Sequence, residues 1–304
     1  MSKNVALALS SGGPRGFAYI GGIEELLARG YKISAISGTS AGALVGGIYA
    51  AGGLETFKEW LLGLDPVKIM RLMDFSISKN YLVKGEKVIA AIKQRVPEAN
   101  IEDLPIPFTA VATDLFTGEE VLFKEGPLFQ AIRASISIPS MFKPVEWKGR
   151  TLIDGGIVNT LPLNRVQRTP GDILVGFNVN QIDAGAIQGF LDSRAALNQG
   201  KAEKPLLQRL QTSIQELRLE ADGREEHLPV NASDNYFKIL QRSFGIMNGT
   251  IARMGIALDP PDVLVDLPFD TYHGVYGYTH AREIIDTGRE LMASALDNYE
   301  RSHA

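Results

Sequence analysis

Residues 33–51, ISAISGTSAGALVGGIYAA, decide the fold of this chain. A short apolar run leads into the pentapeptide Gly38-Thr39-Ser40-Ala41-Gly42, and a stretch of small and apolar residues follows it. The order strand, G-x-S-x-G, helix is the context in which a serine stands as a nucleophile on a sharp strand-to-helix turn. Side chains at positions 38 and 42 would collide with the neighbouring strand or helix, so glycine is expected at both. The competing interpretation is a Gly-rich turn in which Ser40 only caps the helix.

The composition favours a globular protein and argues against several other classes. With 304 residues, of which 45% are hydrophobic and 22% charged, the chain has ample material for one large globular core. The net charge of −4 and the lack of a basic run argue against nucleic acid as a partner. No cysteine is present, which excludes disulfide and thiol chemistry and fits a reducing compartment. The N-terminus lacks a signal-peptide pattern, and no apolar run reaches the length of about 18 residues that a membrane span requires, so we expect a cytoplasmic protein.

The first 51 residues predict two strands that each lead through a loop into a helix, with the first strand over residues 5–9 and its helix over 17–29. A right-handed crossover makes these strands parallel and places both loops at one edge of the sheet. The first loop fails as a dinucleotide site, because Ser11 stands where G-x-G-x-x-G requires glycine and no ribose-binding acid follows the second strand. We therefore expect no nucleotide, and interpret Gly12 and Gly13 as N–H donors to an oxyanion above Ser40. Arg15 adds a positive charge there, or is a surface ion-pair partner.

A second polar turn follows later in the chain. The predicted strand over residues 150–153 ends in Asp154-Gly155-Gly156, where the carboxylate is either functional or part of an Asx turn. Asp114 is expected to be a turn residue in a hairpin of residues 107–113 and 119–124. Residues 60–75 carry a heavy apolar load, which indicates core or, alternatively, an acyl-chain or lipid contact. Further elements are predicted as a helix over 127–134, strands over 172–179 and 262–266, and helices over 236–254 and 279–299.

The order of four motifs resembles the patatin-like phospholipase family, in its bacterial branch. The motifs are the Gly-rich loop with Arg15, the GTSAG pentapeptide, ASISIP at residues 134–139, and Asp154-Gly155-Gly156. The match covers residues 5–180, with a weaker echo in the last 45 residues. It implies one domain over residues 1–304, built as a three-layer α/β sandwich with a mainly parallel central sheet. The core would be 5–180, a helical insertion or cover 184–232, and C-terminal helices 233–304.

The resemblance also implies a chemistry: a serine acyl hydrolase acting on lipid carboxylic esters, as a phospholipase A, lysophospholipase or esterase does, with peripheral membrane contact and no cofactor. Ser40 would be the nucleophile and Asp154 the base of a Ser–Asp dyad. The oxyanion loop would comprise Gly12, Gly13, Arg15 and Gly16, and the elbow would need Gly38 and Gly42. One departure is Ser11, which replaces the usual first glycine of that loop, and we expect it to donate its own N–H.

The distribution of histidine supports a dyad independently of the resemblance. All four histidines, His227, His273, His280 and His303, lie beyond residue 226, and no Cys/His cluster suggests a metal site. The alternatives are a Ser–His–Asp triad that uses His273 or His280 and a scaffold without catalysis that binds a lipid or a partner. A carboxylate base with an ordinary pKa of about 4 would keep kcat/KM constant on acidification through a pH of about 6.5.

Overall fold

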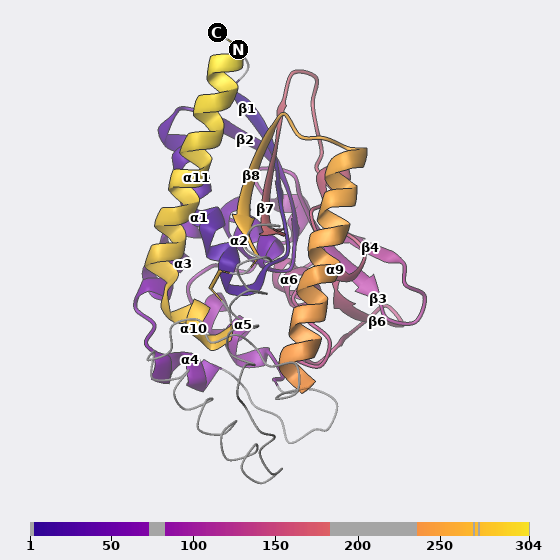
Figure 1. Ribbon diagram of the computed structural model, residues 1–304. Helices are drawn as coiled ribbons and strands as arrows, with labels where there is room; N and C mark the ends of the chain where they lie inside the picture. Colours follow the sequence, from indigo (N-terminus) through magenta and orange to yellow (C-terminus); the bar gives the residue numbers. More distant parts are fainter. Residues whose placement is uncertain (1–2, 73–82, 183–235, 270, 273, 304) are drawn as a thin grey trace, which may run out of the picture.

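The computed structural model describes residues 3–72, 83–182, 236–269, 271–272 and 274–303. Within them, an eight-stranded mixed sheet lies between two layers of helices (Figure 1). The strands are β1 Asn4–Leu9, β2 Lys32–Thr39, β3 Phe108–Asp114, β4 Glu120–Phe123, β5 Val145–Trp147, β6 Arg150–Asp154, β7 Ile173–Gln181 and β8 Val263–Pro268. The α-helices are α1 Ala18–Ala28, α2 Ala41–Ala50, α3 Leu54–Leu62, α4 Pro66–Leu72, α5 Glu86–Lys93, α6 Leu128–Ser135, α9 Tyr236–Leu258, α10 Gly274–Thr279 and α11 Ala281–Ser302. The 3₁₀ helices are η1 Gly13–Phe17, η2 Ile101–Asp103, η3 Gly155–Ile157 and η4 Leu163–Arg165.

The sheet has the order β5-β6-β3-β2-β1-β7-β8, and β4 pairs with β3 outside this path. Its central strands, β3, β2, β1, β7 and β8, are parallel. In β1, every residue after Asn4 is buried, because helices cover both faces of a parallel sheet. The expected fold class, a three-layer α/β sandwich with a mainly parallel sheet, is confirmed.

The two layers differ in size. On one face, α1, α2 and α11 enclose the larger apolar core, which includes Leu7, Leu9 and Phe177. The other face holds a smaller cluster in which Ala6 and Leu174 meet Ala252 of α9. Figure 1 shows α1 and α11 side by side on one side of the sheet and α9 on the other. The predicted cover over 184–232 lies outside the described residues.

One edge of β3 positions the candidate site. β2 pairs with Phe108 to Val111, and β6 pairs with Ala112 to Asp114 in the opposite direction. Because β4 pairs with residues from both stretches, it occupies the other edge of β3. The carboxyl ends of β2 and β6 therefore meet along the same edge, where Thr39 pairs with Val111 and Asp154 pairs with the next residue, Ala112.

The C-terminal part of the chain completes the sandwich. β8 extends the parallel sheet beside β7, and α11 packs along α1. The start of β1 and the end of α11 lie at the same end of the molecule in Figure 1. Among the described helices, none combines the length and the apolar character needed to cross a membrane.

Candidate functional site

Ser40 stands on a strained turn between β2 and α2. Its backbone angles are φ 54° and ψ −116°, a region that costs a non-glycine residue about 1–3 kcal/mol. A Cβ at Gly38 would lie 2.4 Å from the carbonyl carbon of Gly42, and one at Gly42 would lie 2.2 Å from the carbonyl oxygen of Leu9. Only glycine at both positions lets the turn close this tightly, with Ser40 at the N-terminus of α2.

Ser135 holds this turn in place. The Ser40 N–H donates to Ser135 Oγ at 2.8 Å, and the Ser135 hydroxyl donates to the carbonyl oxygen of Val111 at 2.6 Å. Ser135 belongs to the ASISIP motif, and the sequence alone indicated no role for it. The available signal was a serine at the end of a largely apolar helix. Burial of such a helix end also buries the hydroxyl, which must then find a hydrogen-bond partner.

Asp154 is fixed by its backbone. Its N–H donates to the carbonyl oxygen of Ser137 at 2.9 Å, and its carbonyl oxygen accepts from Thr113 Oγ1 at 3.0 Å. The side chain is buried, and its Oδ1 accepts from the Gly156 N–H at 2.7 Å. The Asx-type turn considered from the sequence is therefore present. Asp154 Oδ2 is also buried, and it makes no well-aligned hydrogen bond within the described residues.

The environment of Asp154 changes its acidity. Burial raises the pKa of this carboxyl from its ordinary 3.8 to about 6, while the Ser40 side chain and the Gly156 N–H pull it down. The expectation of an ordinary pKa was therefore wrong, because the turn that brings Asp154 to Ser40 also removes it from water. A base of this pKa loses its charged form on acidification through a pH of about 6, within the range in which histidine titrates.

The loop after β1 shows which amides are available. Ser11 N–H donates to the carbonyl oxygen of Thr160 at 2.9 Å, so the expectation that it serves an oxyanion was wrong. Among the described residues, no acceptor is found for the N–H groups of Gly12 and Gly13. Gly13 has φ 56°, and a Cβ there would meet nothing within 4 Å, whereas one at Gly12 would lie 2.1 Å from Val179 Cγ2. Within the described residues, the N–H groups of Gly12 and Gly13 are therefore available to donate to a bound ligand.

Arg15 and Gly16 fix this loop on two sides. The Arg15 guanidinium is buried, donates to the carbonyl oxygen of Phe269 at 2.6 Å and lies over the Phe269 ring. It also donates to Asn180 Oδ1 at 3.4 Å, so it ties the loop to the ends of β7 and β8. Because Arg15 is buried, the alternative that placed it at the surface was wrong. A Cβ at Gly16 would lie 2.5 Å from that of Ala41, which shows how closely η1 packs on α2.

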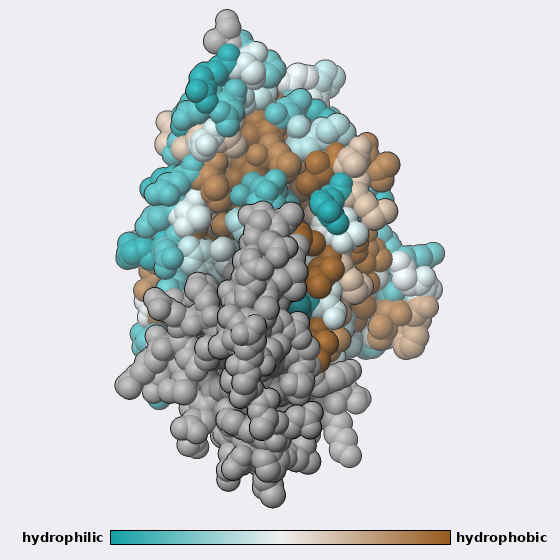
Figure 2. All heavy atoms as spheres, viewed as in Figure 1, coloured by the Kyte–Doolittle hydropathy of each residue, from teal (hydrophilic) through white to brown (hydrophobic). Residues whose placement is uncertain are grey.

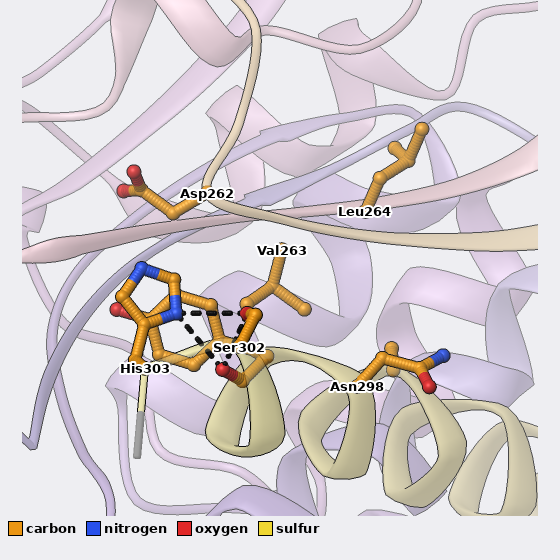
Figure 3. Close-up of a pocket in the computed structure, with 8 residues that line it drawn as sticks. Asp262, Val263, Leu264, Asn298, Ser302 and His303 are labelled. Carbon is orange, nitrogen blue, oxygen red and sulfur yellow. Dashed lines mark hydrogen bonds between the residues drawn. The ribbon is translucent and has the colours of Figure 1, made fainter.

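The described histidines make no hydrogen bond to Ser40 or Asp154. His280 precedes α11, and its Nδ1 lies 3.0 Å from Thr279 Oγ1. His303 lies at the other end of α11, where its Nδ1 is 2.9 Å from the carbonyl oxygen of Tyr299 (Figure 3). His227 and His273 lie outside the described residues, so the triad alternative that uses His273 stays open.

A hollow of about 270 Å³ lies between the start of β8 and the last turns of α11. Figure 3 shows residues that line it, among them His303. It lies toward the amino end of β8, whereas Ser40 follows the carboxyl end of β2, so the two are at opposite edges of the sheet. Its lining residues are Asp262, Val263, Leu264, Ala295, Asn298, Tyr299, Ser302 and His303.

Comparison with known proteins identifies the family of this chain. The family model described as Patatin-like phospholipase matches residues 7–166. An uncharacterized NTE family protein of Mycobacterium bovis is 36% identical over 335 aligned residues, which cover 98% of this chain and 93% of that protein. The chain belongs to the patatin-like phospholipase family. Its expected membership is confirmed, and membership supports lipid acyl hydrolysis at the level of the family.

Two further proteins show a weaker similarity. Mouse Patatin-like phospholipase domain-containing protein 6 is 26% identical over 198 residues, which cover 63% of this chain and 14% of that protein. Among solved structures, VipD from Legionella pneumophila has 14% sequence identity and a TM-score of 0.43, over 96% of this chain and 67% of that one.

Proposed function

We propose that this patatin-like protein is a serine acyl hydrolase that cleaves carboxylic esters of lipids, with Ser40 as nucleophile and Asp154 as base. The observation that carries the proposal is the buried Oδ2 of Asp154, which makes no well-aligned hydrogen bond within the described residues, beside the strained turn of Ser40. A buried carboxylate oxygen left in this state is costly, and such groups cluster at functional sites. Catalytic hydrogen bonds are often loose before substrate binds.

The reaction would run in two halves. First, Ser40 Oγ bonds to the ester carbonyl carbon while its proton passes to the Asp154 carboxylate. The C–O bond to the alcohol then breaks, and Asp154 returns the proton to the leaving alkoxide oxygen. In the second half, a water molecule gives a proton to Asp154 as its oxygen attacks the acyl-Ser40 carbonyl. The acid leaves, and Ser40 Oγ recovers its proton from Asp154.

The negative charge that forms on the carbonyl oxygen needs donors. The open N–H groups of Gly12 and Gly13, together with the positive end of the α2 dipole, would supply stabilisation there. In this account, Arg15 positions the loop through its hydrogen bonds to Phe269 and Asn180, while Gly16 allows the loop to pack closely on α2. The absence of a side chain at Gly13 leaves space above its amide.

The substrate would be presented by a lipid surface, which requires peripheral membrane contact by an otherwise cytoplasmic protein. Part of residues 60–75 is core, because Leu61 and Ile69 are buried. Val67 and Met70 of α4 are exposed and remain available for an acyl or membrane contact. Met73 and Phe75 lie outside the described residues.

Mutation of the base tests the dyad. Asp154→Asn should leave almost no hydrolysis of a p-nitrophenyl ester, while His273→Ala and His280→Ala keep most of it. Asp114→Asn is a matched control, because Asp114 is also buried at a strand end and its Oδ1 accepts the Phe116 N–H at 2.9 Å. An active Asp154→Asn together with an inactive histidine variant would assign the protein to the Ser–His–Asp class.

A further inference from the structure

The inner face of α9 carries small residues. Gly245, Gly249 and Ala252 are buried at a helical spacing, and they are turned toward the sheet. A Cβ at Gly245 would lie 1.8 Å from the ring of Phe269, and one at Gly249 would lie 2.6 Å from Ile182 Cδ1. At the two glycines the helix backbone therefore lies directly against the body of the protein, and further along the same face Ile256 packs against the smaller apolar cluster.

Five large apolar residues of α9 are exposed on its outer face. Ile239, Ile246, Met247, Met254 and Leu258 are between 42% and 85% exposed, and we refer to them as the α9 stripe. Their spacing places them on one side of a helix with 3.6 residues per turn. Figure 2 shows hydrophobic atoms along the line that α9 follows in Figure 1. Exposed large apolar residues gathered on one side of a helix mark an interaction site.

The charges of α9 indicate what binds there. The sequence of the helix, YFKILQRSFGIMNGTIARMGIAL, contains three basic residues and no acidic one, in a chain with a net charge of −4. Arg253 is exposed, whereas the guanidinium of Arg242 lies over the ring of Phe269. A helix with exposed apolar residues beside basic ones has the composition of a segment that lies in the interface of an anionic lipid layer. Two copies of α9 would instead bring cationic helices together.

The inner face of α9 touches the candidate site. Asn248 Nδ2 donates to Ser11 Oγ at 3.1 Å, next to the loop that carries Gly12 and Gly13. The helix also packs against η3, the turn that directly follows Asp154. One helix therefore has the loops of the candidate site on one side and the apolar stripe on the other.

We propose that the α9 stripe docks this protein onto the surface of an anionic lipid layer, with α9 parallel to that surface. The inference rests on the proposed function for the identity of the partner, since a lipid acyl hydrolase must reach substrates held in such a layer. The docking itself is a binding event, which can be measured separately from hydrolysis.

Vesicle co-sedimentation tests the proposal. In a Ser40→Ala background, which leaves the lipids intact, the protein should sediment with vesicles of phosphatidylcholine and phosphatidylglycerol. The double change Met254→Glu and Leu258→Glu should weaken this binding about tenfold or more, the scale of keeping large apolar side chains out of the acyl region. Leu27→Glu is a matched control, because Leu27 is also exposed but lies on α1, and it should bind as the background protein does. Arg253→Gln should lower binding about fivefold.

Further outcomes separate docking from catalysis. The Met254→Glu and Leu258→Glu protein with Ser40 intact should hydrolyse a short soluble ester at the wild-type rate. Equal sedimentation of the double variant and the background protein would overturn the docking proposal. The proposal would also be overturned if light scattering showed that the wild type is a dimer and the double variant a monomer. Stripe-dependent vesicle binding by a protein that cleaves no ester would support docking and refute the proposed hydrolase.

Discussion

Two regions of the molecule follow opposite physical rules. One is the contact between helices α1 and α11, and the other is the carboxyl edge of the sheet. Between the helices, a Cβ at Gly21 would lie 1.9 Å from the carbonyl oxygen of Ile285, and one at Gly288 would lie 2.0 Å from that of Ala18. Each helix thus offers a glycine where the backbone of the other fits, and apolar burial stabilises the contact. At the sheet edge, Ser40 has strained backbone angles and Asp154 has a buried carboxylate. Substitutions in the helix contact should therefore lower stability, whereas substitutions of Ser40 and Asp154 should lower activity without lowering stability.

The largest effect is expected for Ser40. Ser40→Ala and Ser40→Gly should both lower ester hydrolysis by about 10⁴-fold or more, because the nucleophile is lost. Ser40→Ala should unfold at nearly the wild-type temperature. Ser40→Gly should be more stable than Ser40→Ala by about 1–3 kcal/mol, because glycine relieves the positive φ. Near wild-type turnover by either variant would contradict the role of Ser40.

The α1–α11 contact should show the reverse behaviour. Gly288→Val would force the two helices apart and should lower the free energy of unfolding by about 3 kcal/mol or more. The kcat/KM of the folded fraction should hardly change. Ser294→Val places the same side chain on the exposed side of α11, and it should change stability by only about 0.5 kcal/mol. Equal effects of the two variants in urea unfolding would show that this contact does not need its glycine.

Asp154→Asn should be inactive but more stable than the wild type above a pH of about 6. The pKa of Asp154 is raised from 3.8 to about 6 in the folded protein, so folding favours the protonated carboxyl. That stabilisation is complete below a pH of about 4 and is lost as the pH rises through about 6, a difference of about 3 kcal/mol. Urea unfolding at both ends of this range measures it. If Asp154→Asn were less stable than the wild type at a pH of about 8, the claim that the charged Asp154 carboxylate destabilises the folded protein would be refuted.

A smaller effect is expected at the oxyanion loop. Gly13→Ala should lower kcat by about 10²-fold, the scale of one displaced donor. Gly149→Ala is a matched control, because Gly149 also has a positive φ and open space around its Cα, but it lies in the turn between β5 and β6. The control should lose a similar stability, about 1 kcal/mol, and keep its activity. Micromolar binding of NAD or ATP in calorimetry would instead indicate a nucleotide site.

Much of the fold could be predicted from the sequence because the signals were local. The apolar run of β1, the glycines at 38 and 42 and the small residues of α2 each constrain their own segment. The approach of Asp154 to Ser40 was also predicted, but for an incomplete reason. We expected parallel strand ends to gather at one edge, whereas β6 is antiparallel and reaches Ser40 because it shares an edge of β3 with β2.

The remaining features depend on packing between distant segments. The N–H of Ser11 is taken by Thr160, about 150 residues further along the chain, and no local pattern reveals such a contact. The raised pKa of Asp154 follows from burial by several elements together. The orientation of α9 was equally hidden, because a hydrophobic pattern normally assigns the large residues to the core, and here Gly245 and Gly249 take the inner face.

The most direct measurement is covalent labelling with a fluorophosphonate, read by mass spectrometry of the digested protein across a range of pH. The proposed dyad predicts a single modified peptide that contains Ser40, with a labelling rate that falls as the pH is lowered through about 6. It also predicts no label on Ser40→Ala and almost none on Asp154→Asn. Labelling at another residue, or wild-type labelling of Asp154→Asn, would contradict the account.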